Sequence, residues 1–467
     1  MAEFEHRPVA NRMSPVSVGL VALAAMLAGI ADGRATEMPD QPGTPASSPA
    51  STQPQSDRRL AVHGQATYVE QETGGFHSPY AGPNSLTPSQ GREMTSATLY
   101  LGARLWQGAE VWLNPEVDEG FGLDDTTGVA GFPSGLSYKV GSNTPYFRLQ
   151  RAFIRDTFNL GGERTAGGSA PNQFSGELAS DRLVVTFGKF SVTDVFDTNR
   201  YAHDPMQDFL NWSVIDTGTF DYAADAWGYS VGAAVEWYVG DWTARAGLFD
   251  LSDLPNSKTL ESGFDEYQIV VELEHRHELF GHPGKLALTG FESHGRMALL
   301  QDAIDYALAT GGPVDPAPVR RYRKRDGVSL NFEQDISGDL GMFARAGAAG
   351  GNVEAYEFTD IDRTAALGLS LEGMRWHRPQ DTFGLAAVIN GISAERRRYL
   401  AAGGLGILVG DGQLPHAADE HILETYYKWA PLSALHVTLD YQWVRNPAYN
   451  NDRGPASIFA LRVHVQF

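Results

Sequence analysis

Apolar and polar side chains alternate through Phe459-Ala460-Leu461-Arg462-Val463-His464-Val465-Gln466-Phe467. Successive side chains of a β-strand point to opposite faces, so this stretch predicts a strand with one apolar and one polar face. The same alternation recurs at residues 109–118, 229–237 and 435–442. Each run has roughly the ten residues with which a tilted strand crosses a bilayer, and many such strands indicate a closed sheet.

The connections between the predicted strands alternate in length. We count about 16 strands, an even number within the range of single-chain outer-membrane barrels. Links after even-numbered strands are mostly short, as at Gln107-Gly108 and Gly240-Asp241, whereas those after odd-numbered strands are long, as at residues 119–145 and 191–227. Short periplasmic turns and long extracellular loops produce this asymmetry. The sequence therefore predicts an all-β transmembrane antiparallel barrel, with one longer, Gly-rich periplasmic link at residues 161–180.

Composition excludes several other classes of protein. The 467 residues contain 36 Lys and Arg against 57 Asp and Glu, a formal charge of −21, so a nucleic-acid partner would find no basic surface. Hydrophobic residues make up 42%, too few for a bundle of membrane-spanning helices. The chain has no Cys, which removes disulfides and thiolate metal sites.

The N-terminal region has the features of an export signal. Arg7 and Arg12 precede a run of apolar and small residues at 16–31, so we predict a signal peptide over residues 1–35. A membrane anchor is the alternative, although the run is short for a span. Residues 36–59 are rich in Pro, Ser and Thr and predict a disordered linker. The barrel is expected to occupy residues 60–467.

A soluble β-sandwich would show the same alternation, with its apolar faces packed together. Three features favour lipid instead: the signal peptide, the asymmetry of the links, and aromatic residues at strand ends, as in the girdles of membrane barrels. These aromatic residues are Tyr100, Trp106, Tyr229, Trp237, Trp242, Tyr427, Trp429, Tyr441 and Trp443.

A barrel of this width must enclose water unless loops fill it, and the residues that line its narrowest part decide what passes. The polar faces of the predicted strands carry mixed charges together with aromatic rings. This combination suits a neutral polyhydroxylated solute, although the same charges would also solvate a general pore wall. The candidate lining residues are Glu110, Trp112, Asn114, Glu116, Asp118, Arg148, Arg151, Arg245, Arg345, Glu424 and Asp440.

The sequence leaves the strand register around residues 148–155 open. Arg148, Arg151 and Arg155 do not share one parity, so either a β-bulge intervenes or one of the three points to an interface.

Several ordered runs resemble the carbohydrate-selective porin family, OprB. They are NPEVDEGFG (114–122), GVAGFPSG (128–135), FDTNRYAHDP (196–205), FLNWS (209–213), YAADAWGY (222–229), DYQWVRNPAY (440–449) and RGP (453–455). The resemblance extends over essentially all of residues 60–467. It implies a 16-stranded outer-membrane barrel for diffusion of glucose and related sugars, with an arginine-bearing eyelet beside acidic and aromatic residues.

The resemblance implies a passive, substrate-selective porin for monosaccharides, including glucose-type sugars, polyols and sugar acids. Arg148 or Arg151 is the expected eyelet residue, facing Glu116 and Asp118, and a cationic eyelet would attract sugar acids weakly. Arg245 and Arg345 are chosen only by strand parity. Two rivals remain open: a non-selective diffusion pore and a secreted soluble sugar-binding protein.

Two loops have features of their own. The segment from Tyr201 to Asp225 is dense in Asp, Asn and aromatic residues and folds either inward, as a constriction, or outward, as a lid. Met297 to Ala309 has apolar residues at helical spacing and predicts a short loop helix at the rim.

Other motifs are weaker. His277 and His282 are five residues apart, which does not match the i, i+4 spacing of a helical zinc motif. No pattern indicates a cofactor or a hydrolase, so we predict no enzymatic activity. Two basic clusters in predicted extracellular loops are hypothesised to bind lipopolysaccharide phosphates, or else are solvated loops: Arg320, Arg321 and Arg323, and Arg396, Arg397 and Arg398. Oligomeric state is open.

Overall fold

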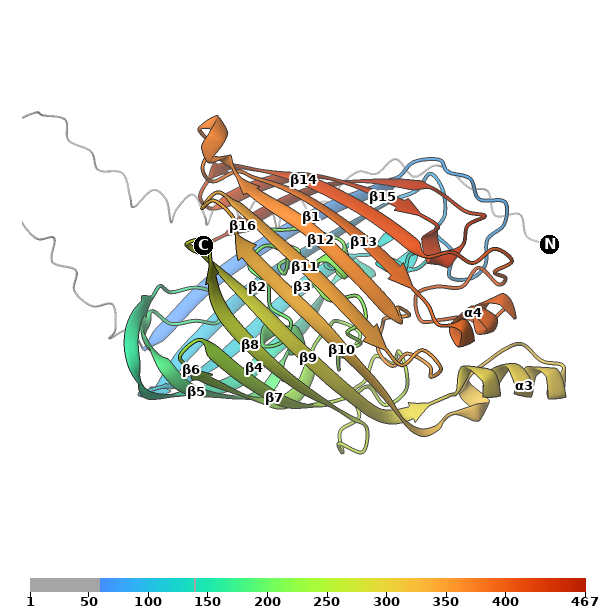
Figure 1. Ribbon diagram of the computed structural model, residues 1–467, viewed down its shortest axis with the longest axis horizontal. Coiled ribbons are helices and arrows are strands. Elements are labelled where there is room, and N and C mark those ends of the chain that lie inside the picture. Colours follow the sequence, from blue (N-terminus) through green and yellow to red (C-terminus); the bar gives the residue numbers. More distant parts are fainter. Residues whose placement is uncertain (1–58, 138–139) are drawn as a thin grey trace, which may run out of the picture.

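The computed structural model describes residues 59–137 and 140–467, so the predicted signal peptide and nearly all of the predicted linker lie outside the described residues. Sixteen antiparallel strands form one closed barrel in which β1 pairs with β16 and each other strand pairs with its neighbours in sequence (Figure 1). The predicted fold is confirmed. The strands are β1 (Leu60–Thr73), β2 (Gly91–Trp106), β3 (Ala109–Gly120), β4 (Ser142–Gly167), β5 (Gly176–Phe190), β6 (Ser230–Val239), β7 (Trp242–Asp250), β8 (Tyr267–Leu279), β9 (His282–Met297), β10 (Arg321–Asp335), β11 (Leu340–Ala349), β12 (Arg363–Glu372), β13 (Thr382–Gly391), β14 (Glu420–Leu432), β15 (Leu435–Arg445) and β16 (Ala456–Gln466).

The apolar faces of the strands point outward. Leu367, Leu439 and Phe459 are each more than half exposed, as are apolar residues on other strands. So much apolar surface is unfavourable in water but favourable against acyl chains, and closure of the ring satisfies the backbone groups that lipid cannot. Among the described residues, no helix is long and apolar enough to cross a membrane.

Part of the predicted aromatic girdle is present at the strand ends. Trp106, Trp237 and Trp242 are each at least half exposed there. Tyr100 and Tyr229, however, line an internal cavity instead. For Tyr100 the reason is parity: it lies between Leu99 and Leu101, which are exposed, so its own side chain must point inward.

The periplasmic link predicted at residues 161–180 is mostly strand. β4 continues to Gly167 and β5 begins at Gly176, with register shifts on either side of Gly161. The glycines keep their backbone donors and acceptors, so the ladder continues and the register shifts absorb the irregular positions. The expected bounds of this link were therefore wrong: residues 168–175 connect the strands, still a longer link than the turns at 107–108 and 240–241.

Short helices lie in the connections. α3 and α4 lie at one end of the barrel and η5 at the other (Figure 1). The predicted loop helix is present as α3, which starts after Met297 because that residue still pairs with Arg321 in the sheet. The helices are η2 (Leu123–Thr126), η3 (Val192–Asp194), α2 (Trp212–Ile215), α3 (Leu300–Thr310), η4 (Ala317–Val319), η5 (Gly373–Trp376), α4 (Ala394–Ala401) and η6 (Pro447–Tyr449).

Candidate functional site

The connection between β5 and β6, residues 191–229, folds into the barrel, and we call it the constriction loop. Phe196, Phe209 and Leu210 are completely buried in it, and Trp212 packs face to face on Phe132 of another loop at 5.3 Å between ring centroids. An external lid would leave these side chains in water. The inward alternative is therefore the one observed, and the main apolar core of the protein lies inside the barrel.

The barrel wall satisfies the backbone of this loop. Glu424 accepts hydrogen bonds from the backbone N–H groups of Leu210 at 2.5 Å and Asn211 at 3.2 Å. Arg345 donates to the carbonyl oxygens of Val214 at 2.6 Å and Ala202 at 2.8 Å. A loop inside a barrel has limited access to water, so its backbone groups need such partners. Asp440 lies beside Glu424 on the same wall.

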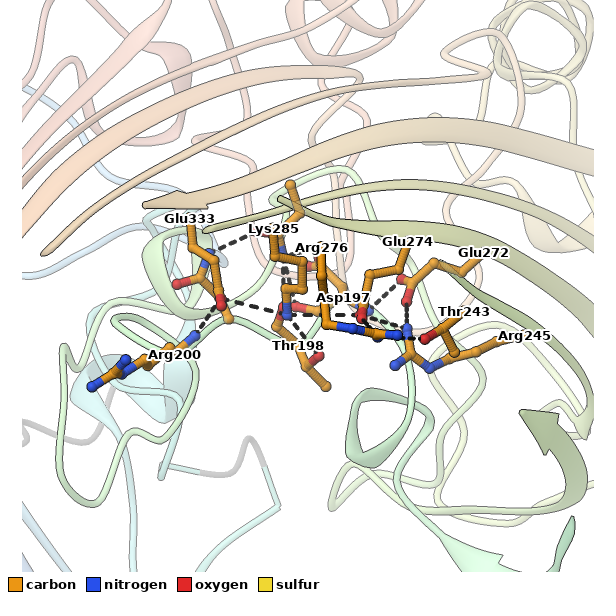
Figure 2. Close-up of polar contacts among 12 residues, drawn as sticks. Asp197, Thr198, Arg200, Thr243, Arg245, Glu272, Glu274, Arg276, Lys285 and Glu333 are labelled. Atoms are coloured by element: carbon orange, nitrogen blue, oxygen red, sulfur yellow. Dashed lines mark hydrogen bonds and ion pairs between the residues drawn. The ribbon is translucent and has the colours of Figure 1, made fainter. Parts of the chain in front are cut away.

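A ladder of charges on β6 to β10 holds the start of the loop (Figure 2). Arg245 is enclosed by Glu236, Glu272 and Glu274 at 2.6–3.0 Å. Glu272 in turn accepts a hydrogen bond from the backbone N–H of Asp197 at 2.8 Å. Arg245 and Arg345, both chosen by parity, do point inward, but they hold charges and loop backbone rather than line an open passage.

The same ladder fixes the next residues of the loop. Lys285 donates to the carbonyl oxygen of Thr198 at 2.7 Å, and Glu333 accepts from the backbone N–H of Arg200 at 2.7 Å (Figure 2). The start of the loop is thus attached to the wall strands β8, β9 and β10.

An open cavity of about 520 Å³ remains between the loop and the strands at the two ends of the sequence, and we call it the passage. Both polar and aromatic side chains face it. The wall contributes Gln65, Tyr100, Glu116, Arg151 and Gln466, and the constriction loop contributes Asp194, His203, Asp204, Trp212, Asp216, Tyr222, Asp225, Trp227 and Tyr229.

A β-bulge at Gln150 places Arg148 and Arg151 on the same face of β4. Arg151 pairs with Asn114 in the ladder, but Pro115 pairs with Leu149, so Gln150 has no partner residue of its own. The extra residue changes which positions point inward beyond the bulge, so residues three apart can share one face of the strand. The bulge alternative is therefore correct, and Arg155 also turns inward, where it pairs with Glu110 at 3.1 Å.

The constriction loop provides a carboxylate for each of these arginines. Arg151 forms a two-pronged ion pair with Asp194, with N–O distances of 2.7 and 2.6 Å. The guanidinium of Arg148 lies over the ring of Trp227, 3.3 Å from its centroid, and its Nη2 is 3.2 Å from Asp225. Guanidinium groups favour both carboxylates and aromatic faces, so each arginine is fixed in position.

The carboxylates on β3 have different surroundings. Glu116 accepts hydrogen bonds from Thr98 at 2.5 Å and from Gln150 at 2.9 Å. Asp118 is buried, and neither of its oxygens has a hydrogen-bond partner among the described residues. Both acids lie on the strand facing Arg148 and Arg151, as expected from the sequence.

Trp112 and Asn114 do not face the passage. Trp112 is fully buried against Phe174, with ring centroids 5.1 Å apart, and it covers Gly102, where a Cβ would lie 2.6 Å from the indole. Trp112 therefore cannot stack on a solute. The aromatic rings that line the passage come mainly from the constriction loop instead.

Two acids of the loop have shifted pKa values. Burial alone would raise the pKa of Asp194, but the charge and hydrogen bonds of Arg151 hold this pKa below its ordinary value, which keeps the ion pair intact. Burial raises the pKa of Asp216 to about 8, so this carboxyl is protonated at neutral pH. The Nδ1 atom of His203 lies 3.8 Å from it, too far for a hydrogen bond.

Sequence analysis missed Asp194, Asp225, Trp227 and Tyr229. Their signal was weak, because they lie in or beside a loop whose path into the barrel depends on distant wall residues. The density of Asp and aromatic residues between Tyr201 and Asp225 indicated the right segment but no partners.

Comparisons with known proteins agree with this architecture. Residues 83–467 match the family described as carbohydrate-selective porin, OprB family. Pseudomonas putida OprB, solved at high pH, superposes with a TM-score of 0.66 at 16% identity, covering 88% of this chain and 95% of that one. The outer-membrane channel DcaP of Acinetobacter baumannii gives 0.50 at 10% identity, covering 87% and 97%. No curated protein sequence matches.

At these identities the structural neighbours show the fold alone, whereas the family match extends over most of the chain. The protein is a channel of the Gram-negative outer membrane rather than an enzyme, and it belongs to the carbohydrate-selective porin family, OprB.

Proposed function

We propose that this porin carries monosaccharides, glucose-type sugars and related polyols, into the periplasm by passive and substrate-selective diffusion. The observation that supports this most is the passage itself, where the Arg151–Asp194 ion pair and the carboxylate of Asp225 lie among aromatic rings. Because the charged groups are paired, they offer hydrogen-bond donors and acceptors to sugar hydroxyls while their charges cancel, so a solute needs no charge of its own to bind. The ring of Tyr229, which lines the passage and is only partly buried, can pack on the apolar face of a pyranose ring.

The loop gives the pore its selectivity in this proposal. A 16-stranded wall alone would leave a wide aqueous hole, and the constriction loop reduces it to a cavity of about 520 Å³. A solute of monosaccharide size must therefore exchange part of its hydration shell for contacts with the lining residues. A sugar acid would bring the same hydroxyls together with a carboxylate, so the charges of the passage decide whether it enters.

Single-channel conductance in planar bilayers, titrated with glucose, tests the proposal. An internal sugar site predicts a reduction of ion current that saturates with glucose concentration. A polyether of similar size, which has few hydroxyls, should reduce the current only in proportion to viscosity. A current that falls linearly with glucose, as it does with the polyether, would indicate a non-selective diffusion pore instead.

A further inference from the structure

The cations at the passage are already paired. Among the described lining residues Arg151 is the one Arg or Lys, and Asp194 occupies the Nε and Nη2 edge of its guanidinium with both carboxylate oxygens. Behind the lining, Arg148 and Lys189 both reach Oδ2 of Asp225, at 3.2 and 2.8 Å. A solute carboxylate would have to displace one of these built-in carboxylates, which are held next to the cation by the fold.

Three carboxylates at the passage form no ion pair. Glu116, Asp204 and Glu357 line it, and within the described residues none of them has an Arg or Lys nitrogen within ion-pair distance. Their hydrogen bonds come from neutral donors, such as Gln150 to Glu116 at 2.9 Å and the backbone N–H of Met206 to Asp204 at 2.9 Å. An anion in this cavity therefore meets carboxylates that no ion pair neutralises, in a space where water screens their charge less than in bulk.

From these contacts we infer that the passage admits uncharged sugars and amino sugars in preference to sugar carboxylates, and that Asp194 and Asp225 set this preference by neutralising the wall cations. The inference rests on the proposed function and names its substrate class. It also opposes the expectation from sequence that exposed arginines would attract sugar acids. The loop, and not the wall, determines the sign of the selectivity.

Amide variants of the two loop acids provide the test. In Asp225, Oδ1 accepts hydrogen bonds from the backbone N–H groups of Trp227 and Tyr229, whereas Oδ2 faces the cations. Asp225→Asn can keep the first pair of bonds while releasing two cations, and Asp194→Asn releases one. Glu395→Gln on α4 removes the same charge from a partly exposed residue that does not line the passage, and is the matched control.

Reversal potentials in a KCl gradient and liposome swelling in glucose, glucosamine and gluconate are the readouts. The wild type should prefer K⁺ to Cl⁻ and admit gluconate more slowly than glucose or glucosamine. Both Asn variants should shift toward Cl⁻, and Asp225→Asn should raise the gluconate-to-glucose ratio by about tenfold, equivalent to about 1.4 kcal/mol. Glu395→Gln should match the wild type.

Wild-type preference for gluconate and Cl⁻, or Asn variants that fold but leave both ratios unchanged, would overturn the inference. Heat-modifiable migration on gels identifies any variant that does not fold, and Asp194→Asn then serves as the second test. Ion selectivity is measured without any sugar, so the inferred preference for K⁺ over Cl⁻ can prove wrong while saturable glucose block is still observed. Absence of saturable glucose block, with the ion selectivity as inferred, would instead reject the proposed function.

Discussion

Arg151 lies where the wall and the constriction loop meet, and its side chain closes part of the passage. We expect Arg151→Ala and Arg148→Ala to raise single-channel conductance and to weaken glucose block. Arg151→Ala removes a bulky side chain and a hydrogen-bond donor from the lining, and Arg148→Ala removes the guanidinium that holds the lining residues Asp225 and Trp227 in place. The measurement is conductance as a function of glucose concentration.

Arg164→Ala is the control for these two variants, because Arg164 lies on the same strand and is largely exposed, paired only with the exposed Glu177. It should leave both quantities unchanged. If Arg148→Ala and Arg151→Ala also behave like the wild type, neither residue belongs to the sugar site.

Asp216 predicts a pH effect on stability. Its pKa rises from an ordinary 3.8 to about 8 because the carboxyl is buried beside Asp197, with Arg345 only partly compensating. The folded protein then holds a proton that the unfolded chain releases, so stability falls as the pH rises from about 4 to about 8. Asp216→Asn cannot lose that proton and should be more stable than the wild type at pH 8.

The temperature at which the folded band disappears on gels, measured at pH 5 and pH 8, checks this prediction. Asp305→Asn on the exposed face of α3 is the control. A wild-type midpoint that falls no more between these pH values than that of Asp216→Asn would contradict it.

Residue parity located the lining of the passage only in part. It placed Glu116, Arg245 and Arg345 on the inner face correctly, because alternation on a regular strand is a local property. Tyr100 was assigned to the girdle from its position near a strand end, whereas its parity between the exposed Leu99 and Leu101 points it inward. Arg148 and Arg151 could not be placed together until the bulge at Gln150 was seen, and a bulge leaves little trace in a single sequence.

Among the elements, the constriction loop depends on Arg345. The guanidinium donates to carbonyl oxygens of Asp197, Ala202 and Val214 and is fully buried. Arg345→Ala would leave these buried acceptors without their donor, at roughly 1–3 kcal/mol for each group left unsatisfied. We expect the loop to loosen while the barrel stays closed, so conductance and current noise should rise and glucose block should weaken.

Limited proteolysis provides a second measurement, since a loosened loop should become a cleavage site while the strands resist. Arg363→Ala, an exposed arginine on β12 that pairs with Asp419, is the matched control. Conductance, noise and cleavage equal to those of the control would show that Arg345 does not hold the loop.

Elements were the most predictable level of this protein. Strand number and the alternation of turns and loops follow from local periodicity and turn residues, so they could be read in advance. The path of the constriction loop could not, because its anchors Glu424, Arg345 and Lys285 lie far away in sequence and show no pattern in common. The Gly-rich segment near Gly161 was also assigned wrongly, because glycine is typical of loops but can still take part in the hydrogen-bond ladder between two strands.

At the scale of the whole molecule, the barrel inverts the pattern of a soluble protein, with apolar side chains outside and charged ones inside. The sequence predicted that inversion. It did not predict that the interior would have an apolar core of its own, formed where Phe196, Phe249 and Trp212 pack within the lumen. The strands of the wall thus present apolar side chains to the lipid, and the constriction loop determines the shape of the passage.

The outer rim bears on the hypothesis of lipopolysaccharide binding. Four of the six arginines form intramolecular ion pairs there: Arg320 pairs with Glu354, Arg323 with Asp302 and the exposed Arg398 with Glu395, while Arg396 is buried with Asp360 and Asp362. Arg396 is only 1% exposed and is not available to a lipid phosphate. We therefore propose that any phosphate contact is made by Arg321, Arg397 and Arg398, which are exposed.

Replacing these three arginines with Gln should reduce the lipopolysaccharide that remains bound to the purified protein, because Arg binds phosphate through two hydrogen bonds and Gln carries no charge. Arg375→Gln with Arg378→Gln, exposed at the opposite end of the barrel, is the control and should retain the wild-type amount. The folded band on gels shows that the rim is otherwise intact. If the triple variant retains as much lipopolysaccharide as the wild type, these arginines are solvated loop residues. That result would not change the account of the pore.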